Sequence, residues 1–329
     1  MTVYTSLLRP LLFRLSAERA HKIGETLLRA NTLWSMLTPL FDLKDARLNT
    51  KLGSIDISNP VGLAAGFDKD CRMLNSLSSL GFGYLVGGTV VSSPRDGNPK
   101  PRIVRNPKER SLVNSLGFPS LGAQNVSSTL SKNRPHGTPV MVSISGLTEE
   151  DFACCFDSFQ PLSDGIELNI SSPNTEGIRI FQSESRLKGL LGELSHLKRK
   201  PVIMKLPPYF DANQRDHVFD LIRISLDHGL EGITVANTWP IEDNRLKMGR
   251  GGLSGEPLFG RTLEMIKEIR QQFGYDFVIN ACGGISSGGQ AVEALMAGAN
   301  TIQLYSSLIY RGPTLIKDMN REILSFLDS

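Results

Sequence analysis

The sequence predicts an α/β protein built as a (β/α)8 barrel of the TIM type, with a small helical extension at the N-terminus. Eight short apolar or β-branched runs follow one another between residues 61 and 305, and helical stretches separate most of them. Several runs end in polar residues, which is how a parallel barrel presents chemistry at the carboxyl ends of its strands. Eight runs over about 270 residues fit a closed barrel better than an open sheet.

The first 45 residues are expected to form two or three short helices that precede the barrel of residues 46–329. Ser16 is placed to cap a second helix that runs to Ala30. Residues 1–30 carry five basic and two acidic side chains, and this excess of +3 equals the net charge of the whole chain. Such a segment either lies on an anionic bilayer or covers one end of a domain, and the residues alone leave both readings open. The leucines that recur at helical spacing are Leu7, Leu8, Leu11, Leu12 and Leu15.

The barrel elements are expected to alternate from residue 61 onward. The strands are placed at 61–65, 84–88, 138–145, 165–170, 201–206, 232–237, 276–282 and 300–305. The clearest helices are placed at 185–198, 212–228, 261–273 and 290–297. The interval from 90 to 137 is too polar and proline-rich for barrel wall, and long inserted loops are usually functional. We therefore expect this interval to lie over the mouth of the barrel.

Composition indicates a soluble globular protein. Of the 329 residues, 40% are hydrophobic and 21% are charged, and no apolar run reaches the length of about eighteen residues that spans a membrane. Arg9, Pro10 and Arg14 interrupt the N-terminal leucines, which is wrong for the core of a secretory signal, so we expect a cytoplasmic protein. A net charge of +3 does not imply binding of nucleic acid. The cysteines show neither a disulfide framework nor a metal spacing and are expected to be reduced packing residues, namely Cys71, Cys154, Cys155 and Cys282.

Two glycine clusters indicate a phosphate-binding site. One spans residues 249–255, and the other spans 283–288 and directly follows the seventh strand. Barrels commonly bind phosphate at this place through backbone N–H groups and the N-terminus of a short helix. Glycines used only for tight turns are the alternative reading. The eighth strand adds Tyr305, Ser306 and Ser307 beside the same expected pocket.

The strand ends and the inserted loop supply lysines, carboxamides and hydroxyls. Four asparagines can fix a planar ligand through paired N–H and C=O contacts without adding charge, which suits a cyclic amide. Lys205 lies in an apolar run, which favours a strand-end position in the barrel over solvated surface. No histidine falls in these clusters, which argues against a His-based triad or metal site. The residues are Lys69, Lys205, Asn114, Asn169, Asn174, Asn237, Thr89, Ser172, Thr175 and Thr238.

Seven segments resemble the dihydroorotate dehydrogenase family, in particular its membrane-associated, quinone-linked class. They are AAGFDKD (64–70), GNPKPR (97–102), NSLGF (114–118), NISSPNT (169–175), GGLSG (251–255), CGGIS (282–286) and QLYS (303–306). Any one of them is weak, but seven in this order are very specific and span nearly the whole chain. The resemblance implies an FMN-dependent oxidoreductase of pyrimidine synthesis.

The resemblance also implies a role for each matched residue. Ser172 is implied as the catalytic base, because the quinone-linked class uses serine where the soluble class uses cysteine, and Thr175 and Phe118 match positions that shape its proton relay. Dihydroorotate-binding positions are matched by Lys69, Asn114, Gly117, Phe118, Asn169, Asn174, Asn237 and Thr238. FMN-binding positions are matched by Ala64, Ala65, Gly66, Thr89, Asn169, Lys205, Ser254, Gly255, Gly283, Gly284, Tyr305 and Ser306, and Ser143 is assigned to the same set by its place on the third strand. Lys205 would place a fixed cation near the N1/C2=O edge of the flavin, which stabilises the anionic reduced ring.

The reaction implied by the resemblance takes a proton from C5 of dihydroorotate and a hydride from C6 to flavin N5, and it yields orotate. Electrons then pass to a membrane quinone. In the quinone-linked class an N-terminal helical pair forms the entry tunnel of this acceptor, and residues 1–35 resemble that pair, with His21 and Arg105 at tunnel-lining positions. This resemblance favours a peripheral position on the inner face of the cell membrane.

Three positions depart from the family pattern. Ser143 stands near the end of the third strand, where the family usually has an asparagine that holds the flavin, and Ser115 and Pro119 replace an arginine and an asparagine beside the substrate lid. These changes raise the question of a shifted substrate preference or an altered lid motion.

Three other functions compete with the main reading. The first is an FMN-dependent oxidoreductase of the same barrel that acts on another cyclic amide or uses a soluble acceptor. The second is a non-catalytic barrel that binds FMN or another phosphate ligand, against which Ser172 and Lys205 count. The third is a phosphate-binding aldolase with Lys205 as Schiff-base nucleophile, which the set of asparagines disfavours.

Overall fold

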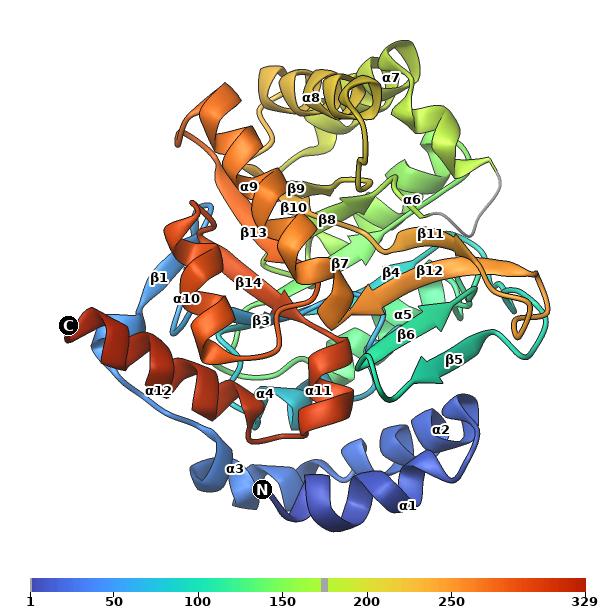
Figure 1. Cartoon of the computed structure of the whole chain (residues 1–329). Helices are drawn as coiled ribbons and strands as arrows, with labels where there is room; N and C mark the ends of the chain where they lie inside the picture. The colour runs from blue at the N-terminus through green and yellow to red at the C-terminus, as the bar shows by residue number, and fades with distance from the viewer. Residues whose placement is uncertain (1, 173–176) are drawn as a thin grey trace.

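The computed structural model describes residues 2–172 and 177–329. Eight parallel strands close into a barrel, as the sequence predicts, and helices cover its outside (Figure 1). In chain order the barrel strands are β3 (Val61–Leu63), β4 (Tyr84–Val90), β7 (Val140–Ile144), β8 (Gly165–Asn169), β9 (Val202–Lys205), β10 (Gly232–Val235), β13 (Val278–Cys282) and β14 (Thr301–Leu304). Parallel pairing of β14 with β3 closes the ring. Nearly every residue of these strands is buried, because helices cover one side and the barrel interior the other, which explains their continuous apolar runs.

The helices around the barrel include all four that the sequence places most clearly. Their apolar stripes pack against the strands in one large core. Local polar residues start several of them: Asp211 accepts the backbone N–H of Gln214 at 2.8 Å, and Thr148 and Asp151 form a capping box. The helices are α4 (Leu74–Ser78), α5 (Ala123–Asn133), α6 (Glu149–Phe159), α7 (Glu184–Leu197), α8 (Ala212–Asp227), α9 (Phe259–Phe273), α10 (Gly288–Met296), α11 (Ser306–Arg311) and α12 (Leu315–Leu327), with 3-10 turns at Ala46–Leu48, Ile178–Gln182 and Glu256–Leu258.

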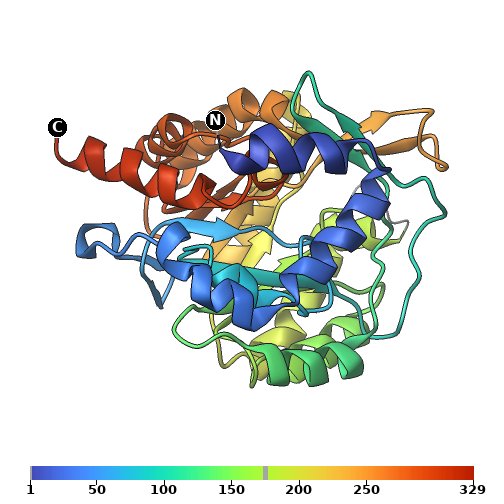
Figure 2. The same ribbon diagram turned by 90° about the horizontal axis from the view of Figure 1, so that it is seen from below.

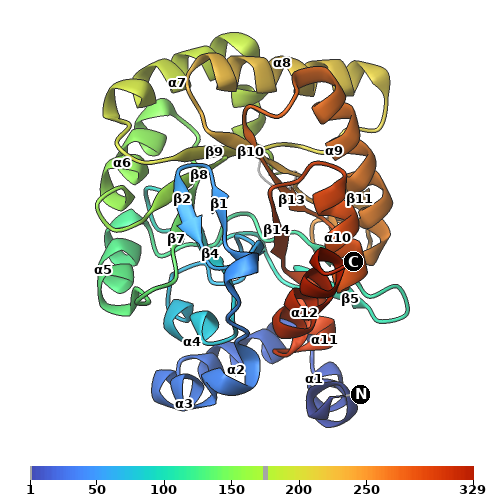
Figure 3. The ribbon, with the colours of Figure 1, turned by 90° about the vertical axis from the view of Figure 1, so that its left-hand side faces the viewer.

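A short hairpin closes the N-terminal end of the barrel. Strands β1 (Thr50–Leu52) and β2 (Ile55–Ile57) pair antiparallel, and Figure 3 shows them in front of the barrel strands. The side chains of Leu52, Ile55 and Ile57 join a second apolar cluster with residues from the barrel interior. Because this end is closed, a ligand enters from the opposite end, where the strands finish.

The inserted interval between β4 and β7 is only partly a cover for the barrel mouth. The expectation for residues 90–137 is correct for the hairpin of β5 (Ile103–Asn106) and β6 (Ser111–Asn114), but α5 belongs to the outer helix layer. The hairpin continues into a four-stranded antiparallel sheet, in the order β11-β12-β6-β5. Its other two strands, β11 (Trp239–Glu242) and β12 (Arg250–Gly255), come from the connection after β10, so two distant segments build one lid.

The first glycine cluster is therefore a strand of this lid. A Cβ at Gly251 would lie 2.6 Å from the backbone oxygen of Asn114, so the close pairing of β12 with β6 requires glycine there. At the end of the strand, Gly255 has a φ of 110°, a conformation that disfavours other residues.

Three N-terminal helices lie beside the barrel rather than within its helix layer (Figure 2). After a π-helical turn at Tyr4–Leu8 they are α1 (Arg9–Phe13), α2 (Ala17–Leu28) and α3 (Asn31–Phe41). The predicted cap of the second helix is confirmed, because Ser16 accepts the backbone N–H of Arg19 at 3.4 Å. The Tyr4 hydroxyl donates to the backbone oxygen of Ile309 at 2.6 Å and fastens the segment to α11.

Many large apolar side chains of these helices are in contact with solvent. Leu7 is 62% exposed, Leu11 58% and Met36 75%, which is unusual for so many large apolar residues in one short segment. Further members are Val3, Leu8, Ile23, Leu27, Leu33 and Leu40. Within the described residues, none of the helices has the length and apolar character needed to span a membrane.

Candidate active site

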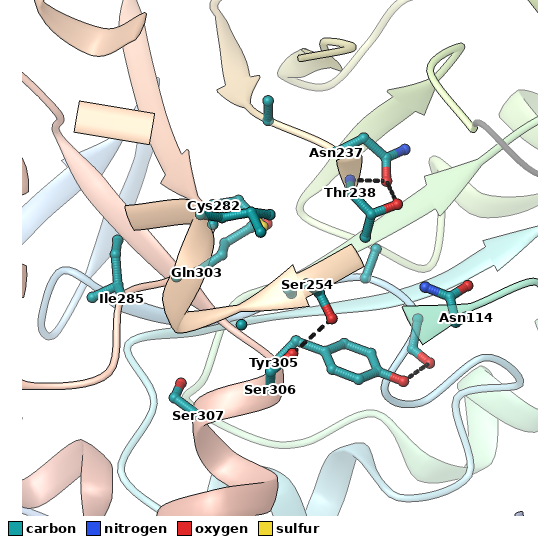
Figure 4. Close-up of a pocket in the computed structure, with 18 of the residues that line it drawn as sticks. Asn114, Asn237, Thr238, Ser254, Cys282, Ile285, Gln303, Tyr305, Ser306 and Ser307 are labelled. Carbon is teal, nitrogen blue, oxygen red and sulfur yellow. Dashed lines mark hydrogen bonds between the residues drawn. The ribbon is translucent and has the colours of Figure 1, made fainter. Parts of the chain in front are cut away.

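A deep pocket lies at the carboxyl ends of the barrel strands, below the lid sheet (Figure 4). Its empty volume is about 1180 Å³, part of which is open solvent. Lining residues come from the ends of the strands, from β6 and β12 of the lid, and from the start of α11. In Figure 4, Asn237 and Thr238 lie across the pocket from Ser306 and Ser307. The pocket therefore joins an amide-rich region with a hydroxyl-rich one.

The amide-rich region is organised around Asn169. Its Nδ2 donates to Thr89 Oγ1 at 3.0 Å, and its Oδ1 accepts from Asn237 Nδ2 at 3.4 Å. The same Oδ1 accepts from the backbone N–H and the hydroxyl of Ser171, both at 3.3 Å. Asn237 in turn uses its Oδ1 to accept from the Thr238 backbone N–H at 2.8 Å. These bonds hold two carboxamides in fixed orientations at the ends of β8 and β10.

Ser172 lies three residues beyond the end of β8 and lines the pocket with only 7% of its surface exposed. On the lid side the pocket is lined by Asn114, Gly117 and Phe118. Phe118 has a φ of 52°, a left-handed conformation that is uncommon for a large side chain and often marks a functional position. The predicted site residues Asn174 and Thr175 lie outside the described residues.

Lys69 is one of the cations that line the pocket. Its Nζ donates to the backbone oxygen of Gly66 at 3.1 Å. Burial, with the positive charges of Arg102 and Lys205, lowers the pKa of Lys69 to about 8 despite the opposing charge of Asp70. At neutral pH the ammonium group is still charged and can bind a carboxylate.

Lys205 is a second cation, placed at the end of β9 and 6% exposed. Burial opposes its charged form, but the neighbouring Cys282 and Glu167 favour it, and the pKa of Lys205 is raised. Cys282 itself lines the pocket. The structure thus places a buried lysine in the wall of the cavity, in surroundings that favour its charged form.

The hydroxyl-rich region lies beside the second glycine cluster. Gly284 has a φ of 76°, and a Cβ there would lie 2.3 Å from the backbone nitrogen of Phe259, so only glycine fits. The hydroxyls of Ser254 and Ser306 lie 2.9 Å apart. The buried hydroxyl of Ser307 has no hydrogen-bond partner in the described part of the chain. Serine hydroxyls and the glycine turn after β13 form a polar end that suits a phosphate group.

His21 and Arg105 do not line this pocket but lie along the N-terminal helices. Arg105 stacks over the Phe13 ring at 4.5 Å and donates to the backbone oxygens of Leu12 and Leu15, at the end of α1. The Phe13 ring contacts Tyr310, a pocket-lining residue, with 5.4 Å between ring centroids. His21 in α2 retains contact with solvent, but burial by surrounding protein and the positive charge of Lys69 lower its pKa. The helices therefore reach the wall of the pocket through Tyr310.

The structure brings nearly all the predicted site residues into this one pocket. Those that line it are Ala64, Ala65, Gly66, Lys69, Thr89, Asn114, Gly117, Phe118, Asn169, Ser172, Lys205, Asn237, Thr238, Ser254, Gly255, Gly283, Gly284, Tyr305 and Ser306. Ser143 does not line it: its hydroxyl lies behind Thr89, 3.0 Å from Thr89 Oγ1. The short side chain of Ser143 on β7, the third barrel strand, can support Thr89 but cannot reach into the cavity.

Several residues that line the pocket were not predicted from the sequence as site residues. Cys282 was expected only to pack, yet it lines the cavity beside Lys205. Gln303 also lines the cavity. It lies two positions before Tyr305, and residues two apart along a strand point to the same side, so the sequence could have predicted that Gln303 faces the pocket. Four more lining residues come from loops and helix ends that lie far apart in the sequence, so no local sequence pattern predicts that they meet. They are Arg110, Glu256, Tyr310 and Arg311.

Comparisons with known proteins point to one family. The model of the dihydroorotate dehydrogenase family matches residues 47–327. The chain is 36% identical over 335 residues to a dihydroorotate dehydrogenase (quinone) of Xanthomonas oryzae pv. oryzae, with 94% of this chain and 93% of that protein covered. It is 35% identical over 343 residues to the protein of the same name from Chromobacterium violaceum, with 98% of each covered.

Solved structures give the same picture. The chain is similar to DHODH from Eimeria tenella in its crystal structure with ferulenol, with a TM-score of 0.85 and 28% sequence identity. That comparison covers 97% of this chain and 95% of the other. The ligand-free structure from the same organism has a TM-score of 0.79 at 28% identity and covers 91% of this chain and 94% of the other.

Proposed function

This chain belongs to the dihydroorotate dehydrogenase family, and from that membership we propose that it oxidises dihydroorotate to orotate with bound FMN and delivers the electrons to a membrane quinone. The observation that carries the proposal is the convergence of three sets of residues in one cavity. A serine after β8, a fixed set of amides with Lys69, and a glycine and serine end with Lys205 all line the same pocket. The near full-length similarity to proteins named as quinone-linked enzymes supports the choice of acceptor.

The substrate is held by its carboxylate and its cyclic amide groups. Lys69 binds the carboxylate, and the carboxamides of Asn114, Asn169 and Asn237 pair with ring N–H and C=O groups. Because Asn169 and Asn237 are bonded to each other and to neighbouring hydroxyls, the ring is held in one orientation. We also assign Asn174 to this set from the family motif.

Ser172 takes the proton from C5 of the bound ring. A serine hydroxyl is a weak base, so this step needs a substrate C–H acidified by the adjacent carbonyl and a path for the proton away from the serine. Phe118, which lines the pocket on the lid side, and Thr175 of the family motif are assigned to that path.

The polar end of the pocket fits FMN. Gly255, Gly283 and Gly284 line the pocket together with the hydroxyls of Ser306 and Ser307, and glycine turns of this kind can present backbone N–H groups to a phosphate. Lys205 then lies in the pocket floor, where its charge can face the N1/C2=O edge of the ring. When bound, FMN accepts the two electrons from the substrate and passes them to the acceptor.

The N-terminal helices, residues 1–45, are assigned to the quinone and the membrane surface. Their exposed leucines lie beside basic residues, a combination that binds an anionic bilayer through apolar burial and charge attraction. Tyr310 joins this segment to the pocket through its contact with Phe13. A lipid-soluble quinone can reach the flavin along that side, with His21 and Arg105 beside its path.

The first test is the visible spectrum of the purified protein. We expect a yellow protein with FMN bound, and Lys205→Ala is expected to raise the dissociation constant for FMN by roughly tenfold or more, the usual worth of a hydrogen bond to a charged group. The control is Lys267→Ala, which removes an exposed lysine of α9. A colourless protein that neither binds nor is activated by added FMN would contradict the proposed function.

The second test uses the pH dependence of orotate binding. The pKa of Lys69 is lowered to about 8, so its ammonium group is charged below this pH and neutral above it. Affinity for orotate is therefore expected to fall by about tenfold between pH 7 and pH 9, as one charge interaction is lost. Titration of the flavin absorbance with orotate measures this, and Lys69→Met should bind weakly at every pH. An equally steep fall in the Lys69→Met variant would remove Lys69 as its cause.

A further inference from the structure

The barrel interior holds two buried charges of opposite sign on neighbouring strands. The charged residues that are buried among those described are Asp68, Glu167, Lys205 and Arg270. Asp68 lies in the loop after β3, and Arg270 lies in α9 outside the barrel. Glu167 of β8 is 1% exposed, and it precedes by two positions Asn169, the register partner of Lys205. Residues two apart share one face of a strand, so Glu167 and Lys205 both face the barrel interior.

One hydrogen bond of a buried network holds the Glu167 side chain. Its Oε2 accepts from Thr234 Oγ1 at 3.0 Å, and Thr234 is also the register partner of Lys205 on the other side. Thr234 accepts from Asn280 Nδ2 at 3.3 Å, and Asn280 Oδ1 accepts from the Tyr84 hydroxyl at 2.7 Å. The other oxygen, Oε1, is buried without a hydrogen-bond partner among the described residues. A carboxyl group in this setting can stay ionised only with a cation nearby to offset the cost of its burial.

Of the two groups that favour the charged form of Lys205, only Glu167 is a carboxyl group, and the other is the Cys282 thiol. Burial raises the pKa of the Cys282 thiol above its ordinary value, so this thiol stays protonated near neutrality. Glu167 favours the ammonium form, whereas burial alone would lower the pKa of Lys205. Glu167, two positions before the register partner of Lys205 and bonded to Thr234 on the other side of it, is therefore the candidate counter-ion of the lysine.

We propose that Glu167 is a positioning residue of the flavin site, whose buried carboxylate is the counter-ion that keeps Lys205 charged at the end of β9. The inference rests on the proposed function insofar as Lys205 is the cation beside FMN. Glu167 touches neither substrate nor flavin and acts only through the lysine. Its effect is to make the positive charge at the flavin independent of pH across the neutral range.

The direct experiment compares Glu167→Gln with the wild-type protein and with Glu193→Gln, a matched change at an exposed glutamate of α7. The two-electron reduction potential of bound FMN is measured from pH 6 to pH 9. In Glu167→Gln, Lys205 loses its proton as the pH rises, so the potential should fall increasingly below the wild-type profile. We expect the ratio of reduced to oxidised flavin at a fixed dye potential to drop by roughly tenfold at the alkaline end, the worth of one lost charge interaction.

A Glu167→Gln profile parallel to that of the wild type overturns the proposal. A reduction potential of Glu167→Gln that is higher than that of the wild type by the same amount at every pH overturns it as well. Glu167 would then act directly on the negative charge of the reduced flavin and not through the proton of Lys205. The Glu193→Gln profile should overlay that of the wild type.

A second experiment tests the proposed coupling of Glu167 and Lys205 without flavin and so separates this inference from the proposed function. Thermal unfolding is measured for the apoprotein, Glu167→Gln, Lys205→Met and the double variant. Each single variant leaves one buried charge without its partner and should lower the Tm. The double variant should lose less than the sum of the two losses, because no unpaired charge remains. Additive losses show that the two residues are not partners, whatever the protein binds.

Discussion

Replacing Ser172 by alanine is expected to slow the reduction of bound FMN by dihydroorotate by roughly two to four orders of magnitude, the usual contribution of a positioned general base. Ser172 is a buried residue of the pocket wall, next to the amides that we assign to the substrate ring. Alanine removes the hydroxyl but leaves Lys69 and the carboxamides in place, so binding of orotate should change little. Anaerobic stopped-flow bleaching of the flavin, with a parallel titration by orotate, measures both quantities.

The matched control for this variant is Ser163→Ala. Ser163 is also buried, but its hydroxyl donates to the backbone oxygen of Phe159 at 2.8 Å and it does not line the pocket. It should leave the reduction rate close to that of the wild type. Near-normal reduction in Ser172→Ala would refute the assignment of the base, and loss of orotate binding would show that the serine supports the site rather than the proton transfer.

Deleting residues 1–35 is expected to abolish turnover with quinone and binding to anionic vesicles, while reduction of the flavin by dihydroorotate stays measurable. The deleted segment carries most of the exposed apolar side chains of the N-terminal helices and the Phe13 ring that contacts Tyr310. The pocket residues that we assign to the substrate all lie outside it. Steady-state assays with a soluble quinone, vesicle sedimentation and single-turnover reduction separate the three functions.

Point variants test the same surface without removing the helices. Leu7→Asp combined with Leu11→Asp places two charges on the exposed face and should weaken vesicle binding strongly. Leu327→Asp, at an exposed leucine near the end of α12, should leave it unchanged. Full quinone turnover by the truncated protein, or a preference of the intact protein for fumarate or NAD, would show that the quinone-linked assignment is wrong.

The strands and the polar residues at their ends were predictable from the sequence because both are local signals. Buried parallel strands read as short apolar runs, and the run that ends in Asn169 already carries its change to polar residues. The cap at Ser16 was predictable for the same reason, since a cap and its helix are neighbours in the chain. The family motifs then related Lys69 and Lys205 to one function, although they lie 136 positions apart in the sequence.

The lid was only partly predictable. Residues 249–255 were expected as a phosphate loop, and the structure makes much of that segment a strand that pairs with β6. No local sequence pattern predicts this pairing, because the partner strand lies more than a hundred residues earlier. The helix α5 within the inserted interval was not predicted, because most of its residues are polar and a polar run of this kind also occurs in loops.

The sequence by itself determined the barrel class, the order of its strands, the helical N-terminus and the residue types that reach the mouth of the barrel. Only the tertiary structure decided which of these side chains meet. It placed Ser143 behind Thr89 rather than in the pocket, brought Cys282 beside Lys205, and set Glu167 beneath the pocket floor. The physical reason is that strand formation depends on the apolar pattern of a few consecutive residues, whereas contacts across a barrel depend on register and closure, which are set by all eight strands together.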